Sequence, residues 1–226
     1  MAGDRRTRGR GVGLPESSTP GTPVVAPEDE ALVVLAVRGP MEASALASAL
    51  ALDGRATRSL VACQAARGLL EEDAGGRARL TGAGLAAAGA VLAREQHALG
   101  PATAGLAERF DDLNRRVKAA ITDWQVVRVG SALVPNDHSD PRRDAAVIER
   151  LMQAGSAAAQ LLRPLSRARR RIEVLLRRLD EALSRVVAGG SDWICGLGVD
   201  SVHSVWWSLH AELLALLGRE RGEADA

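Results

Sequence analysis

Residues 67–84 read RGLLEEDAGGRARLTGAG, and this stretch decides the fold. The Gly75-Gly76 pair predicts a tight turn between two short extended segments. Thr81 follows at a position where its hydroxyl can cap a helix that begins at Gly82 and runs to about Leu99. The stretch therefore predicts a small β-hairpin followed directly by a helix.

Three short helices are expected before this hairpin. The first opens with the acidic turn Glu28–Glu30 and stops at Gly39-Pro40, and the second covers Glu42–Leu50. The third runs from about Arg55 to Leu70. Three closely joined helices followed by a hairpin predict a winged helix-turn-helix domain over residues 28–100, with the hairpin as the wing.

The third helix and the wing carry the side chains that we expect to contact double-stranded DNA. In a winged helix the third helix normally enters the major groove, and its donors contact phosphates and base edges. The expected DNA-binding residues are Arg55, Arg58, Ser59, Arg67, Arg77 and Arg79. The acidic run Glu71, Glu72 and Asp73 at the base of the wing favours the alternative that this module binds a protein.

Two polar residues of the third helix stand where an apolar core residue is usual. Thr57 and Gln64 occupy these inward positions. Polar side chains at these positions are not expected in a helix that packs in the ordinary way.

Residues 101–220 predict an antiparallel helical bundle, so that the whole chain is expected to be mainly α. Apolar positions from Leu106 to Trp124 alternate in steps of three and four, which indicates a long amphipathic helix. A loop from about Gln125 to Asp140 follows, and Asp140-Pro141 then opens a helix that Pro164 is expected to break. Further helices are expected up to Gly189-Gly190 and from about Val199 to Leu217.

The aromatic residues and the unusual polar strings all fall in this second half. His203 and His210 are seven residues apart and so share one helical face, with Trp207 between them. We expect a small-molecule effector, anionic or metal-bearing, to bind in a pocket there; the alternative is that these polar groups are structural caps and interface residues. The candidate ligand-binding residues are Trp124, Asp137, His138, Asp140, His203, Trp207 and His210. No two histidines have the spacing of four that places both on one ion, so no metal site is predicted.

The composition of the chain limits which partners, compartments and kinds of chemistry can be expected. Lys+Arg 29 against Asp+Glu 28 leaves a net charge of +1, so any DNA contact must come from a local patch. Residues 1–27 and 221–226 are expected to be disordered tails. The two distant cysteines and the lack of a long apolar run favour a cytoplasmic protein without a membrane segment. No catalytic motif or cofactor fingerprint is recognisable, so neither an enzyme nor a cofactor is expected.

Two family resemblances follow from these passages. Arg67–Leu70 and Arg79–Gly84, on either side of the turn, resemble the helix end and wing of MarR-like bacterial regulators. The helical half resembles an actinobacterial region that occurs alone or attached to phosphoenolpyruvate-utilising, pyruvate phosphate dikinase-like enzymes. The strings that carry this second resemblance are Leu113–Lys118, Thr122–Gln125, Asn136–Asp140 and Asp200–Trp206.

The resemblances imply a transcriptional regulator that forms a homodimer through its long helices and responds to an effector bound in the helical half. The alternative is an accessory module that binds a partner protein, such as a phosphotransferase, without DNA. The two hypotheses differ in whether the third helix contacts DNA, and this difference can be tested.

Overall fold

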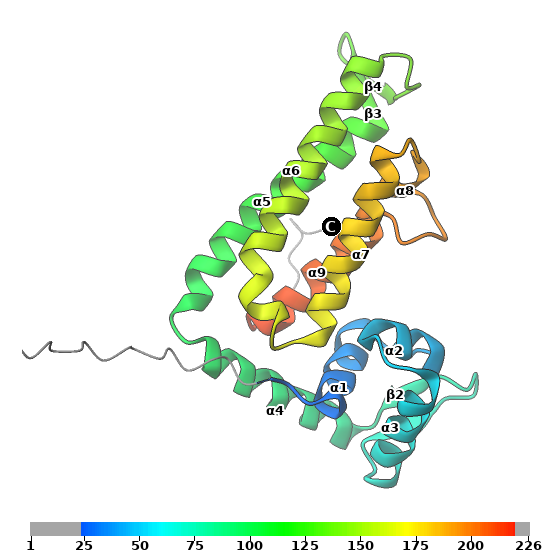
Figure 1. The fold of residues 1–226 in the computed structure, drawn as a ribbon, viewed down its shortest axis with the longest axis vertical. Helices are drawn as coiled ribbons and strands as arrows, with labels where there is room; N and C mark the ends of the chain where they lie inside the picture. Colours follow the sequence, from blue (N-terminus) through cyan, green and yellow to red (C-terminus); the bar gives the residue numbers. More distant parts are fainter. Residues whose placement is uncertain (1–23, 220–226) are drawn as a thin grey trace, which may run out of the picture.

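The computed structural model describes residues 24–219 of the chain, and it confirms that the fold is mainly α. The described helices form two groups that lie one above the other in Figure 1. We call residues 24–100 the N-terminal unit and residues 101–219 the helical half. Most of the residues predicted to form disordered tails lie outside the described part.

The N-terminal unit consists of three short helices, a hairpin and a longer helix. Its elements are α1 (Pro27–Arg38), α2 (Ala43–Leu50), α3 (Gly54–Ala66), β1 (Leu70–Glu72), β2 (Ala78–Leu80) and α4 (Gly82–Leu99). The strands β1 and β2 pair antiparallel, and Met41 before α2 adds an isolated bridge to Ala78. The hairpin turn places Gly76 at φ 73°, in the left-handed region that favours glycine.

Local sequence signals set the boundaries of these elements. Asp53 caps α3 by accepting a hydrogen bond from the Ala56 N–H at 2.8 Å. Thr81 caps α4 in the same way, because its hydroxyl accepts from the Gly84 N–H at 3.1 Å. Gly84 is required for packing, since a Cβ at this position would collide with the Leu69 carbonyl. The helix therefore begins directly against β1.

The helical half is built from two long helices, a hairpin between them and a shorter group of helices. Its elements are α5 (Ala102–Gln125), β3 (Val126–Val129), β4 (Ala132–Pro135), α6 (Pro141–Ser166), α7 (Arg170–Val187), α8 (Asp192–Cys195) and α9 (Val202–Leu216). Figure 1 shows α5 and α6 side by side, with the β3–β4 hairpin at the end distant from the N-terminal unit. Helix α7 packs between α6 and α9.

Several predicted boundaries were wrong. The predicted loop over residues 125–140 contains the β3–β4 hairpin, in which Val126 pairs with Pro135 and Val129 with Ala132. Helix α6 continues through Pro164 to Ser166, so the proline lies in its last turn and the helix ends two residues after it. Helix α3 ends at Ala66, and Leu70 belongs to β1.

The two halves have separate apolar interiors. The helical half contains one large cluster, in which Phe110 stacks on Trp206 with ring centroids 5.4 Å apart. The N-terminal unit has two small clusters of aliphatic residues, one around Leu46 and Leu50 and the other around Leu32 and Leu70. No helix within residues 24–219 is long and apolar enough to cross a bilayer.

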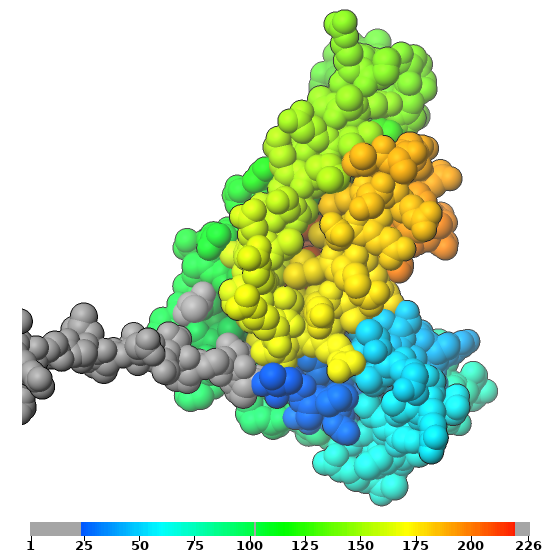
Figure 2. Space-filling view, viewed as in Figure 1, coloured from blue at the N-terminus to red at the C-terminus, as the bar shows by residue number. Residues whose placement is uncertain are grey.

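A network of buried charges joins the halves. Figure 2 shows the N-terminal elements, blue to cyan, in contact with α7, yellow to orange. At this contact Arg171 of α7 lies 2.6 Å from a carboxylate oxygen of Glu95 on α4, 3.0 Å from Glu212 on α9 and 3.4 Å from Glu30 on α1. All four side chains are buried. Arg38 of α1 lies 3.1 Å from Glu212, and Arg169 lies 2.8 Å from Glu95; we call these six residues the junction network.

Candidate functional site

The exposed side of α3 carries the first candidate site. Its buried residues, Thr57, Leu60 and Gln64, face the rest of the N-terminal unit. Arg55 and Arg58 therefore lie on the opposite, exposed side. Within residues 24–219 neither arginine has an ion-pair partner, so both guanidinium groups are available to an external anion.

Ser59, the third residue predicted at the start of α3, is also exposed. Asp53 caps the N-terminal end of the helix, and the first turn of α3 itself contains no acidic side chain. The start of α3 thus presents two cations and a hydroxyl to solvent.

The other predicted DNA contacts are already engaged within the molecule. Arg77 pairs with Asp73 at 2.7 Å, and Arg79 pairs with Glu71 at 2.8 Å across the hairpin. Hydrogen bonds from the backbone and side chain of Arg77 lower the pKa of Asp73. Arg67 donates to the side-chain oxygen of Gln64 at 2.9 Å.

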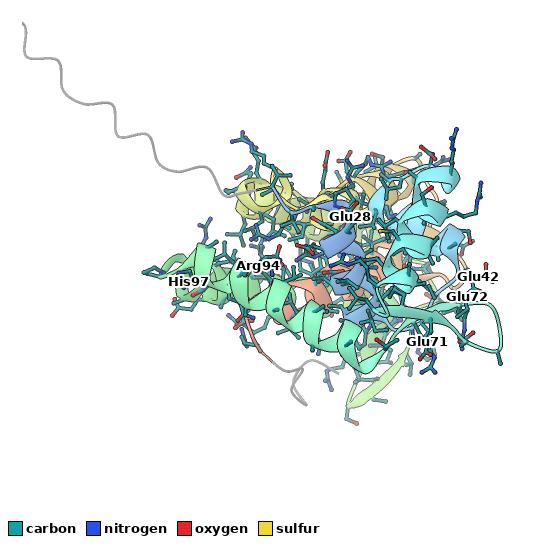
Figure 3. The ribbon with its side chains drawn as sticks, turned by 90° about the horizontal axis from the view of Figure 1, so that it is seen from below. Glu28, Glu42, Glu71, Glu72, Arg94 and His97 are labelled. Carbon is teal, nitrogen blue, oxygen red and sulfur yellow. The ribbon has the colours of Figure 1, made fainter. Side chains whose placement is uncertain are left out.

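The acidic side chains near the hairpin offset the positive charge of its arginines. Figure 3 shows Glu42, Glu71 and Glu72 labelled close together on this side of the molecule. Backbone pairing brings them there, because Met41 and Glu72 both pair with Ala78. The positive charge of this surface therefore lies at the start of α3 and not on the hairpin.

The polar positions Thr57 and Gln64 prove to be fully buried and hydrogen-bonded. The Thr57 hydroxyl donates to the Asp53 carbonyl at 3.0 Å, and Gln64 Nε2 donates to the Glu28 carbonyl at 3.0 Å. Gln64 thus ties α3 to the first turn of α1 and holds Arg67 by its other end. The helix packs normally, since its buried polar atoms are satisfied.

A cavity of about 160 Å³ between α5 and α9 forms the second candidate site. Helical spacing brings His203, Trp207 and His210 to it, as predicted from the sequence. His210 is buried, while His203 and Trp207 are exposed. We call it the α5/α9 cavity, and its lining residues are Asn114, Val117, Lys118, Ile121, Thr122, Gln125, His203, Trp206, Trp207 and His210.

The α5/α9 cavity combines an apolar wall with convergent polar groups. Trp206 forms part of the wall, and its indole N–H donates to the Asn114 side-chain oxygen at 2.9 Å. Phe110 packs against His210 behind the cavity, with ring centroids 5.8 Å apart. Lys118 supplies a cation on α5 opposite the histidines. This combination of aromatic surface with cationic and imidazole groups suits a small anionic ligand.

The four remaining predicted ligand residues gather at the hairpin end of α5 and do not line the α5/α9 cavity. His138 stacks on Trp124 with ring centroids 4.3 Å apart, and its Nδ1 lies 3.0 Å from Asp144. Asp140 caps α6, and Asp137 accepts the Ser139 N–H at 3.0 Å. Hydrogen bonds from Ser139 lower the pKa of Asp137. The structure therefore divides the predicted pocket into two separate groups.

The junction network was missed by sequence reasoning. Its arginines and glutamates come from α1, α4, α7, α9 and the α6–α7 turn, so no local spacing relates them. Burial lowers the pKa of Arg171, but the carboxylates of Glu212, Glu95 and Glu30 outweigh it and raise the pKa overall. Burial raises the pKa of Glu30.

Comparison with family models, with curated proteins and with solved structures found no match. Within residues 24–219 no three His, Cys, Asp or Glu side chains are grouped in a way that could hold a metal ion.

Proposed function

We propose that this protein is a DNA-binding transcriptional regulator whose N-terminal unit is a winged helix-turn-helix. The arrangement of α1, α2 and α3, followed by the β1–β2 hairpin and the Met41 bridge, supports this assignment. Helix α3 would enter the major groove, and the hairpin would lie beside it as the wing.

The proposal rests mainly on the exposure of Arg55 and Arg58 and on the carboxylates that the other arginines already contact. Both are exposed at the start of α3 and have no ion-pair partner within the described residues, whereas Arg77 and Arg79 are neutralised by neighbouring carboxylates. A surface that keeps two arginines unpaired at a helix start is suited to phosphate and base contacts. We expect Arg77 and Arg79 to contribute less to DNA affinity.

The test is selection of bound fragments from genomic double-stranded DNA, followed by affinity measurement over a range of salt concentrations. Changing Arg55 and Arg58 together to Ala should weaken binding by about 2–5 kcal/mol and flatten the salt dependence. The matched control changes Arg109 and Arg116, two exposed arginines of α5, to Ala. Equal losses in the two double variants, or no selected DNA at all, would contradict the proposal.

We further propose that the regulator is a homodimer joined through the helical half and that an effector binds in the α5/α9 cavity. Most of the large apolar side chains that remain exposed lie in the helical half, including Val129, Leu133, Val187 and Leu197. Light scattering should give twice the 23.7 kDa mass of one chain. A monomer mass at micromolar concentration would exclude this dimer.

The acidic hairpin surface favours one alternative function. Glu42, Glu71 and Glu72 would repel DNA but would suit a basic protein surface, such as that of a phosphotransferase partner. In that case Glu71→Lys with Glu72→Lys should abolish partner capture. The same double change should strengthen DNA binding if the regulator proposal is correct.

A further inference from the structure

A second group of exposed arginines lies in the helical half, where α6 ends and α7 begins. Residues 163–170 contain four arginines and no acidic residue. Arg169 is buried in the junction network, whereas Arg163, Arg167 and Arg170 are exposed. Within residues 24–219 none of these three guanidinium groups has an ion-pair partner. We call the three exposed residues the turn arginines.

Contacts with the N-terminal unit hold the turn arginines beside the end of α2. The Arg170 backbone N–H donates to the Glu30 carboxylate of α1 at 2.9 Å. The Val25 N–H donates to the Ala168 carbonyl at 2.9 Å. The Arg170 guanidinium lies 3.4 Å from the Ala51 carbonyl, directly after α2. Figure 2 shows the end of α6 and the start of α7, yellow, beside the blue to cyan N-terminal unit on one face of the molecule.

The distance between the turn arginines and the start of α3 suits a DNA duplex. Ala51 and Arg55 are four residues apart in the chain, so their Cα atoms are separated by no more than about 15 Å. The major groove of B-DNA is about 12 Å wide, and phosphates border it on both sides. With the start of α3 in this groove, a cation beside Ala51 would lie near the phosphates of one bordering strand.

We propose that the turn arginines contact the phosphate backbone of the DNA that α3 binds, so that the interface includes the helical half. This inference rests on the proposed function, because it requires DNA in contact with α3. Phosphate contacts position a protein on the duplex without specifying sequence, and they need cations that no carboxylate has neutralised. Arg77 and Arg79 of the hairpin are neutralised, so the turn arginines supply backbone contacts that the wing does not.

The junction network sets the spacing between the two groups of arginines. Arg169 and Arg171, on either side of Arg170 in the chain, are both buried in this network. They fix where Arg170 leaves the turn, so the turn arginines are placed relative to α3 before DNA binds. Such a preformed arrangement reduces the ordering cost of binding.

The test measures the affinity of the full chain for a duplex selected from genomic DNA and for a scrambled duplex of equal length, over a range of salt concentrations. Arg163→Ala with Arg167→Ala removes two turn arginines whose side chains make no hydrogen bond or ion pair with other described residues. Arg170 is left unchanged because its side chain also contacts the end of α2. The matched control is the double change of Arg109 and Arg116 to Ala on α5.

We expect the variant at 163 and 167 to bind both duplexes about tenfold more weakly at about 0.1 M salt. The slope of log affinity against log salt should become shallower by about 1–2, because two phosphate contacts are lost. Arg55→Ala with Arg58→Ala should instead reduce the preference for the selected duplex. Arg163→Lys with Arg167→Lys should bind as the wild type does, because a phosphate contact requires the charge rather than the shape of the guanidinium.

Three results would overturn the inference. Equal affinities and salt slopes in the Ala variant at 163 and 167 and in the α5 control would do so while leaving the proposed function intact. A weakening that the two Lys replacements do not prevent would mean that the arginines act through the fold and not through phosphates. Absence of DNA binding by the wild type would overturn the proposed function and this inference together.

Discussion

The N-terminal unit and the helical half stabilise their interiors in different ways. All five aromatic residues lie in the helical half, where Phe110, Trp124 and Trp206 belong to one continuous core. The N-terminal unit has only small aliphatic clusters, and it buries Thr57 and Gln64 with their hydrogen bonds satisfied. The difference indicates that specific polar contacts, including the junction network, stabilise the N-terminal unit, whereas burial of aromatic side chains stabilises the helical half.

The largest effect is expected when the junction network loses its central cation. Arg171→Met leaves Glu30, Glu95 and Glu212 buried without their main partner, so the free energy of unfolding should fall by about 3–5 kcal/mol. Tryptophan fluorescence reports only on the helical half, whereas far-UV circular dichroism reports on both halves. In urea the two signals should coincide for the wild type and separate for the variant.

The matched control for this experiment is Arg177→Met, at an exposed position of the same helix. It should change the free energy of unfolding by no more than about 0.5 kcal/mol. Coincident transitions and a loss below about 1 kcal/mol in Arg171→Met would show that the halves are joined mainly by apolar contacts.

A smaller effect is expected inside the aromatic core. Asn114→Ala leaves the buried Trp206 indole N–H without its acceptor, which should cost about 1–3 kcal/mol in urea unfolding. Trp206→Phe removes that donor, so Asn114→Ala should cost clearly less when it is added to Trp206→Phe. Equal costs in the two backgrounds would mean that Asn114 contributes through packing alone.

The smallest effect is a pH dependence at the junction. Burial raises the pKa of Glu30 above its ordinary value of 4.5, so the folded state holds this proton more tightly than the unfolded state. The stabilisation is fully present below pH 4.5 and is lost as the pH rises through the folded-state pKa. The stability of the wild type relative to Glu30→Gln should therefore fall with rising pH over this window.

Chemical unfolding at a series of pH values from 4.5 upwards measures this difference. Glu28→Gln removes a carboxylate from an exposed position of the same helix and separates burial from the loss of one negative charge. A stability difference that rises with pH would show that Arg171 and the backbone donors, and not burial, control the ionisation of Glu30.

The sequence predicted the elements that local signals define. Asp140-Pro141 at the start of α6, Thr81 at the start of α4 and the Gly75-Gly76 turn all act where they were expected. The β3–β4 hairpin was missed although Val126–Val129 and Ala132–Pro135 flank a Gly-Ser pair. Four-residue strands give a weak periodic signal, and the polar loop that follows them obscured it.

The candidate sites were predicted only where one element carries them. His203, Trp207 and His210 reach one cavity because they share a helical face. The separation of His138 from them, and the junction network, depend on how distant segments pack. Arg171 and Glu30 are 141 residues apart in the chain, and nothing in either local sequence indicates that they meet.

The junction network also limits how this sequence can change in evolution. Arg171 is in contact with three carboxylates from three helices, so a neutral replacement at one of these four positions leaves an unbalanced charge inside the molecule. Apolar replacement of the whole set would be tolerated, but it requires several changes at once. Among descendants of this sequence, positions 30, 95, 171 and 212 should therefore be retained or replaced as a group, and single replacements should be the rarest class.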